Sequence, residues 1–83
     1  MKDSIVKEKS FQFSLKIIEL YKKLSSQNEY IISKQLLRSG TSIGANIEEA
    51  LAGQSKKDFT AKMSISSKEA RETKYWVKVI TGK

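Results

Sequence analysis

The chain has 83 residues, enough for one domain spanning residues 1–83 with a small core. It contains no cysteine, histidine or proline, which excludes disulfides and thiolate metal sites, removes the usual general base and thiol nucleophile of an enzyme, and permits long helices. Lys and Arg outnumber Asp and Glu by 16 to 9, a net charge of +7 that attracts polyanions, and no apolar run approaches the ~18 residues of a membrane span.

Residues 3–24 are predicted to form the first helix, because the apolar residues recur at helical spacing. They fall on two stripes, one made of Phe11, Leu15 and Ile18, the other of Phe13, Ile17, Leu20 and Leu24. Together the stripes form an apolar arc wider than the ~100° that one core contact needs, so we expect neighbours on two sides of this helix. The remaining face carries a lysine at every seventh position, namely Lys2, Lys9, Lys16 and Lys23.

A second helix is predicted over residues 29–52, with Asn28 as its cap after a polar break. Its middle is slender because Gly40 and Gly44 lie among serines, and each glycine costs about 1 kcal/mol of helix propensity relative to alanine. We expect the helix to continue through both glycines and to approach another backbone there. The inward stripe is predicted to consist of Ile32, Leu36, Ile43, Ile47 and Leu51.

A third helix is predicted over residues 56–80, after Gly53 ends the second helix and Ser55, with Asp58 three residues later, forms a variant of the capping box. Apolar and small residues then alternate at steps of four and three, the pattern of a bundle seam. The seam residues are Phe59, Met63, Ser66, Ala70, Thr73, Val77 and Ile80. An arc of roughly 120° on the opposite side is basic, at ~100° per residue. Tyr75 lies within this arc, and we expect Tyr75 and Trp76 to anchor the core or an interface.

Three long helices joined by short turns predict an all-α fold, an up-down bundle of the four-helix type. No alternation typical of strands competes with this interpretation. The wide apolar arcs of the first and third helices require more cover than three helices give one another. We therefore expect a fourth helix or another subunit to supply it.

An ordered set of polar and small residues runs from Gln35 to Trp76. It consists of Gln35, Leu36, Arg38, Ser39, Ser42, Ile43, Asn46, Ile47, Glu49, Ser55, Asp58, Phe59, Lys68, Glu69, Ala70, Glu72, Thr73, Tyr75 and Trp76. In these positions the chain resembles the four-helix bundle proteins of 23S rRNA intervening sequences, also called S23 ribosomal proteins. The first helix fits the family more loosely, and Ala50 stands where the family commonly has glycine.

The resemblance implies an up-down-up-down bundle that assembles as a ring-like homopentamer. It also implies distant kinship with the accessory bundle of diversity-generating retroelements, which binds a reverse transcriptase and nucleic acid through a basic surface. Members of the family continue beyond the position of Trp76 into a fourth helix, and this chain is expected to lack that C-terminal helix.

The basic residues of the first and third helices are predicted to contact the phosphates of nucleic acid, with little reading of bases because lysine predominates. The residues are Lys56, Lys57, Lys68, Arg71, Lys74, Lys78, Lys9, Lys16 and Lys23. The expected ligand is RNA or a single strand, held by a homo-oligomer beside a partner such as a reverse transcriptase or ribosomal RNA. The alternative is a structural adaptor that scaffolds a protein partner, with a basic face that is only a solvated surface. The length of the helices disfavours a helix-turn-helix DNA reader.

Five polar residues lie near the apolar sides of their helices, where a buried ion must find a partner. They are Arg38, Asn46, Glu49, Glu69 and Glu72. We interpret them as an internal network that fixes helix register or subunit contacts. Di-metal bundles use similar clusters of carboxylates, but they also need Glu-x-x-His pairs, so neither a metal site nor a cofactor is predicted. The whole sequence favours a cytoplasmic, non-enzymatic protein that does not associate with membranes.

Overall fold

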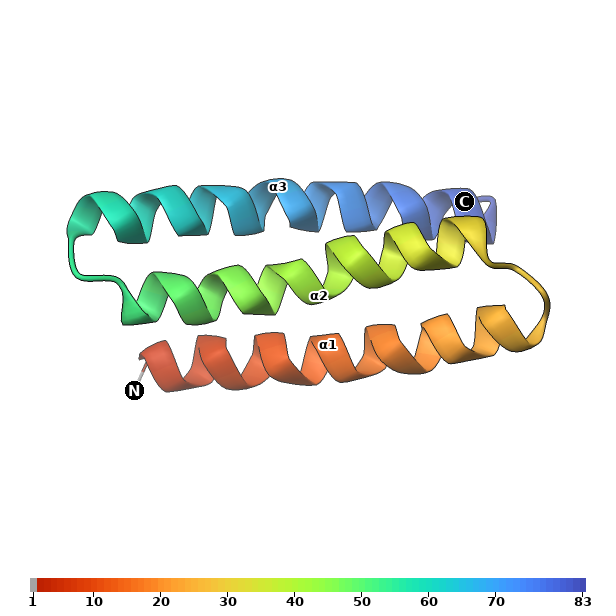
Figure 1. The fold of residues 1–83 in the computed structure, drawn as a ribbon, viewed down its shortest axis with the longest axis horizontal. Helices are drawn as coiled ribbons and strands as arrows, with labels where there is room; N and C mark the ends of the chain where they lie inside the picture. The colour runs from red at the N-terminus through yellow and green to blue at the C-terminus, as the bar shows by residue number, and fades with distance from the viewer. Residues whose placement is uncertain (1) are drawn as a thin grey trace.

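The computed structural model describes the backbone of residues 2–83 and the side chains of residues 5–83. Three helices follow one another along the chain: α1 (Lys2–Ser26), α2 (Ile31–Ala52) and α3 (Lys56–Thr81). Neighbouring helices run antiparallel, and the described residues include no strand (Figure 1). The prediction of an all-α up-down bundle is therefore confirmed, with helix ends that move by two residues or fewer.

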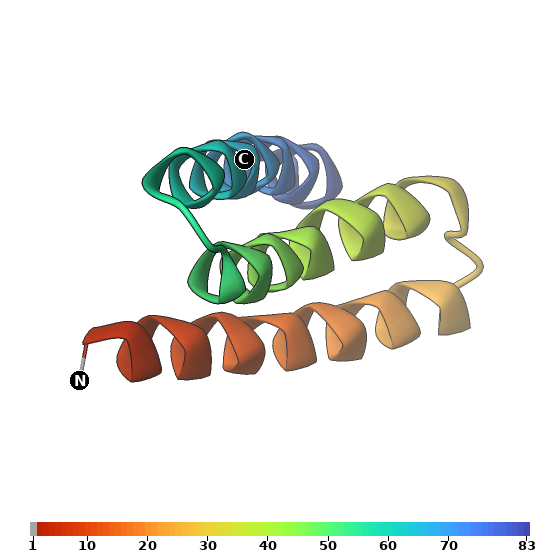
Figure 2. The same ribbon diagram turned by 60° about the vertical axis from the view of Figure 1, so that its left-hand side comes forward.

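The central helix, α2, is the one that contacts both others, while no Cα atom of α1 lies within 8 Å of a Cα atom of α3. Figures 1 and 2 show α1 and α3 on opposite sides of α2. The molecule is elongated, 43 Å long and 19 Å across. Because α1 and α3 are not adjacent, each presents a flank that no helix of the described chain covers.

The core lies where the C-terminal end of α1, the N-terminal half of α2 and the C-terminal end of α3 meet. Ile17, Leu24 and Leu36 are buried at its centre. Leu20 and Leu37 pack against them, as do Trp76, Val77 and Ile80 from α3. Leu36 is the largest side chain with no exposed surface. It belongs to the predicted inward stripe of α2, so that stripe does face the core.

The predicted passage of α2 through its two glycines is confirmed, and each glycine lies against α1. A Cβ atom added at Gly40 would lie 2.8 Å from Cγ1 and 2.8 Å from Cγ2 of Ile17. One added at Gly44 would lie 3.1 Å from Oγ of Ser14 and 3.3 Å from the carbonyl oxygen of Ser10. The small residues therefore let the two helices approach more closely than larger side chains would allow.

Hydroxyl groups join α2 to α3. Ser66 donates a hydrogen bond from its hydroxyl to the carbonyl oxygen of Ile43 at 3.0 Å, and the buried hydroxyls of Thr73 and Ser39 lie 2.9 Å apart. These contacts give hydrogen-bond partners to polar atoms that burial separates from water. The seam predicted for α3 thus lies against α2 through its small polar members, whereas Phe59 at its start stays 41% exposed.

The predicted cap of α2 is wrong. Asn28 has a φ of 65° and closes α1 in the left-handed conformation, which asparagine tolerates better than most residues. The carboxylate of Glu29 caps α2 instead, accepting hydrogen bonds from the backbone N–H of Ile32 at 3.0 Å and of Ser33 at 2.6 Å. At the other turn, Ser55 accepts from the backbone N–H of Asp58 at 3.0 Å, as the capping pattern predicts.

The Glu29 cap makes part of the stability depend on pH. The hydrogen bonds from the backbone N–H groups of Ile32 and Ser33 lower the pKa of this carboxyl below its usual value of 4.5. Because the pKa is lower in the folded state, the ionised carboxyl stabilises the protein at pH values above the pKa of the unfolded state. This stabilisation is lost as the pH falls through the pKa of the folded state. We expect the thermal midpoint of the native protein to fall more on acidification to about pH 3 than that of Glu29→Gln. Parallel curves for the two proteins would argue against the cap.

No helix among the described residues is long and apolar enough to cross a membrane.

Candidate nucleic-acid interface

Three of the predicted basic residues gather with an aromatic ring near the C-terminal end of α3. Arg71, Lys74, Tyr75 and Lys78 line one shallow depression. Residues three and four apart on a helix are neighbours on its surface, with Cβ atoms about 5–6 Å apart. The hydroxyl of Ser67 accepts a hydrogen bond from the Arg71 guanidinium at 3.1 Å, which helps to hold that side chain along the helix.

The other basic residues of α3 extend this cluster towards the start of the helix. Lys56, Lys57 and Lys68 are exposed and share the arc that faces away from α2. At 1.5 Å per residue, the distance along the axis from Lys57 to Lys78 is about 32 Å. The basic face of α3 is therefore a strip along the helix, densest around Tyr75.

The aromatic pair of α3 divides into one exposed and one packed residue. Tyr75 is 58% exposed, whereas Trp76 packs against the core and donates a hydrogen bond from Nε1 to Glu72 at 2.8 Å. The two rings meet edge to face, with centroids 5.1 Å apart. The packing role expected for Trp76 is thus observed, but Tyr75 lies in solvent among the cations.

The lysines of α1 form a separate strip. Lys9 and Lys16 line a depression together with Glu8, Gln12 and Phe13. Lys23 lies in the last turn of α1, and the side chain of Lys2, which opens the predicted row, lies outside the described residues. Since no Cα atoms of α1 and α3 approach within 8 Å, the structure leaves the two basic rows apart, on different helices.

None of the nine predicted basic residues takes part in an ion pair among the side chains of residues 5–83. The cations that do are Lys7, which pairs with Glu48 at 3.3 Å, and Arg38. No carboxylate forms an ion pair with these cations among the described side chains, so each strip keeps an attraction for anions.

The predicted polar network is reduced in the structure to three of its five members. The Arg38 guanidinium pairs with Glu69 at 3.2 Å and with Glu72, across the outer side of the α2–α3 contact. Asn46 donates instead to the carbonyl oxygen of Ser42 in its own helix, and Glu49 is exposed. The Arg38 side chain is 49% exposed, so this network joins two helices at the surface rather than inside the core.

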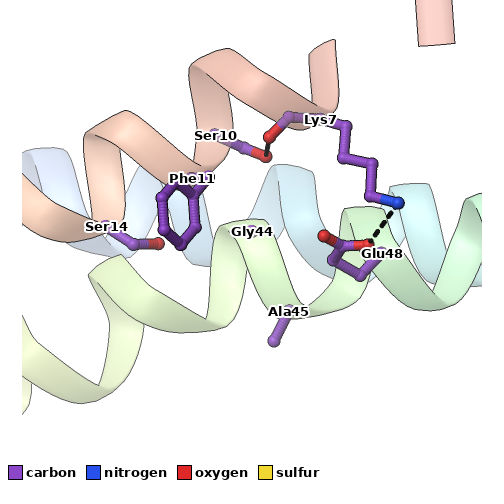
Figure 3. A pocket seen from close by; sticks show the side chains of 7 residues that line it. All are labelled: Lys7, Ser10, Phe11, Ser14, Gly44, Ala45 and Glu48. Carbon is purple, nitrogen blue, oxygen red and sulfur yellow. Dashed lines mark hydrogen bonds and ion pairs between the residues drawn. The ribbon is translucent and has the colours of Figure 1, made fainter. Parts of the chain in front are cut away.

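A further depression, which the sequence patterns did not reveal, lies on the outer side of the α1–α2 contact (Figure 3). It has a volume of about 130 Å³ and is lined by Lys7, Ser10, Phe11, Ser14, Gly44, Ala45 and Glu48. The ring of Phe11 forms one wall, and the Lys7–Glu48 ion pair closes one end. The sequence feature that could have indicated this depression is the pair of small residues Ser10 and Ser14, four positions apart on α1. Among the described residues no cluster of His, Cys, Asp and Glu could hold a metal ion.

Comparison with known proteins agrees with this architecture. Residues 2–82 match the model of the family described as 23S rRNA-intervening sequence protein. A crystal structure of a protein of unknown function from the S23 ribosomal protein family of Bacteroides thetaiotaomicron VPI-5482 is 54% identical, with a TM-score of 0.94. The match covers 98% of this chain and 73% of that one. No curated protein matches the sequence. The match over nearly the whole chain shows that the protein belongs to the 23S rRNA-intervening sequence protein family.

Proposed function

We propose that this protein binds nucleic acid, as RNA or a single strand, through the basic face of α3 while assembled as an oligomer. The observation that carries the proposal is the cluster of Arg71, Lys74 and Lys78 around an exposed Tyr75. None of these cations is neutralised by a carboxylate among the described side chains. Cations that neutralise phosphates release condensed counterions, and this release drives binding.

The shape of the surface favours a flexible or structured RNA over base-specific reading of duplex DNA. The basic strip runs along one long helix, and lysine, which contacts phosphates without fixed geometry, predominates in it. The family name connects its members with 23S rRNA intervening sequences, so a structured segment of ribosomal RNA is the first ligand to test. Such a role requires no catalysis or cofactor, and we propose that the protein carries it out in the cytoplasm.

Assembly is supported by the outer side of α1. Phe11 and Leu15 are 54% and 41% exposed there, and the depression beside Phe11 has a floor of small residues that can receive a side chain from another subunit. The same surface favours the second candidate function, a structural adaptor that holds a protein partner such as a reverse transcriptase. In that case the basic face would carry only solvent and counterions.

The decisive experiment reverses the charge of the cluster. The triple variant Arg71→Glu, Lys74→Glu, Lys78→Glu should bind a structured RNA at least tenfold more weakly at low salt, and the slope of log K against log salt should fall by about 2. The matched control is the triple variant Lys22→Glu, Lys34→Glu, Lys83→Glu, which changes the net charge equally at exposed positions outside the cluster. This control should lose much less affinity for RNA. Circular dichroism verifies that both variants fold.

Two outcomes would reject the nucleic-acid assignment. Equal losses of RNA affinity in the two variants would mean that binding depends only on the net charge. Undiminished binding by the folded variant of Arg71, Lys74 and Lys78 would mean that α3 is not the contact surface. Light scattering on the native protein with and without RNA, in the same buffers, measures the oligomer. Recovery of a protein partner after nuclease treatment would favour the adaptor.

A further inference from the structure

Tyr75 places an aromatic ring inside the basic cluster of α3, and phosphate binding alone gives this ring no role. The side chain is 58% exposed, more than any other aromatic side chain of the protein. It lines a shallow depression of about 310 Å³ together with Arg71, Lys74 and Lys78. The cluster therefore presents a flat apolar surface between three positive charges.

The ring lies on the side of α3 that faces away from the rest of the molecule. Thr73 meets Ser39 of α2, and Tyr75 follows two residues later, about 200° further round the helix. The next two residues, Trp76 and Val77, pack against the core. The exposure of Tyr75 is therefore set by its position on α3 and does not depend on which element lies beside α1.

Neighbouring side chains restrict the Tyr75 ring. The ring of Trp76 meets it edge to face, with an angle of 67° between the two planes. Trp76 is itself held, because Nε1 donates a hydrogen bond to Oε2 of Glu72 at 2.8 Å, and the same oxygen accepts from the Arg38 guanidinium. Two rings that meet edge to face are not stacked, so at least one face of the Tyr75 ring is free of Trp76. A ring that is restricted before binding loses less entropy when a ligand stacks on it.

An open aromatic face between cations matches the chemistry of an unpaired nucleotide. A base has a flat aromatic face that can stack on a side-chain ring, and the phosphates of its own strand lie on either side of it. Arg71 and Lys78 lie about one turn before and one turn after Tyr75, on the same surface of the helix. They are therefore placed to contact the phosphates that flank a stacked base. A base inside a duplex is already stacked between its neighbours, so its face is not accessible to the ring.

We infer that Tyr75 stacks on one unpaired base while Arg71, Lys74 and Lys78 hold the adjoining phosphates. The site then selects loops, bulges and single strands over duplex. This inference rests on the proposed function and specifies which part of an RNA the basic face binds. Stacking uses a face that every base has, so it agrees with a surface that reads little sequence.

The test compares two RNAs with equal numbers of phosphates, a single strand of about 20 nucleotides and a duplex of about 10 base pairs. Phosphate contact alone favours the duplex, which releases more counterions per phosphate neutralised. Fluorescence anisotropy should nevertheless show that the native protein prefers the single strand. Tyr75→Ala should weaken binding of the single strand about fivefold or more and change binding of the duplex by less than about twofold.

Conservative variants separate the ring from the rest of the side chain. Tyr75→Phe keeps the aromatic face and should bind the single strand within about twofold of the native protein, whereas Tyr75→Leu, which is apolar but has no such face, should be as weak as Tyr75→Ala. Tyr30→Ala is the matched control, because Tyr30 is 52% exposed but does not line the basic depression. Circular dichroism verifies that each variant folds.

Two further measurements distinguish stacking from a change in charge. The Tyr75 ring is uncharged, so Tyr75→Ala should leave the slope of log K against log salt unchanged, unlike the triple reversal of Arg71, Lys74 and Lys78. The second measurement uses 2-aminopurine, an adenine analogue whose fluorescence is quenched by stacking, placed in a strand of uridines. Its emission at saturation should fall with the native protein and with Tyr75→Phe but not with Tyr75→Leu.

Several results would overturn the inference. They are equal losses in Tyr75→Ala and Tyr30→Ala, a Tyr75→Phe variant as weak as Tyr75→Ala, and a native protein that prefers the duplex. If the triple reversal of Arg71, Lys74 and Lys78 weakens both RNAs while Tyr75→Ala weakens neither, stacking is rejected and the proposed function stands. If the native protein binds neither RNA, both are rejected.

Discussion

Replacing Leu36 with alanine is expected to destabilise the protein by about 2–5 kcal/mol, the cost of removing a large buried side chain whose cavity does not collapse. Leu36 has no exposed surface, and it joins the core residues of α1, Ile17 and Leu24, to those of α3. Domains of this size have a total stability of about 5–15 kcal/mol, usually towards the lower end. The variant should therefore lose a large part of its stability, and a measurable fraction should be unfolded near 37 °C.

Urea denaturation followed by circular dichroism measures this effect. Ile31→Ala provides the control, because Ile31 lies in the same helix and is similar in size but is 80% exposed. Its substitution should change the free energy of unfolding by less than about 0.5 kcal/mol. Similar midpoints for the two variants would mean that the three helices do not share the core seen here.

The periodicity of the sequence was sufficient to predict the helices and their apolar faces. Leu36 and Ile47, predicted on the inward stripe of α2, are buried, and the expected approach of another backbone is present at Gly44, beside the carbonyl group of Ser10. These features depend on local spacing and on side-chain size, which a single sequence displays. The turn after α1 was harder, because Asn28 and Glu29 can both cap a helix and only the left-handed φ of Asn28 decides between them.

Which neighbour each face meets could not be read from the spacing. The two stripes of α1 are equivalent on a helical wheel, and only the contacts of Ile17 with Gly40 show that its stripe lies against α2, while Phe11 lines the outer depression. The polar residues show the same limit: Arg38 reaches Glu69 and Glu72, but Asn46 bonds within its own helix. A wheel gives the direction of a side chain relative to its own axis and not the register of the facing helix.

Gly40→Ala tests the close approach of α1 and α2, and here two effects oppose each other. Alanine gains about 1 kcal/mol of helix propensity over glycine. The added Cβ, however, would lie 2.8 Å from both Cγ atoms of Ile17, a residue only 4% exposed, and overpacking of this kind costs about 1–3 kcal/mol. The γ carbons of a β-branched residue cannot withdraw easily, because few rotamers are open to it in a helix. We expect the collision to prevail and the variant to be less stable than the native protein.

A double-mutant cycle with Ile17→Ala isolates the collision from the propensity. Removal of the Ile17 γ carbons leaves room for the new methyl group, so Gly40→Ala should become stabilising in the Ile17→Ala background by about the helix-propensity difference. The coupling between the two sites should then be about 1–3 kcal/mol, measured by urea denaturation of the four proteins. Gly44→Ala, whose added Cβ would meet the Ser14 hydroxyl at 3.1 Å, should show little coupling to Ile17 because its neighbours are other residues. Additive effects of Gly40→Ala and Ile17→Ala would mean that the two helices are farther apart than this packing requires.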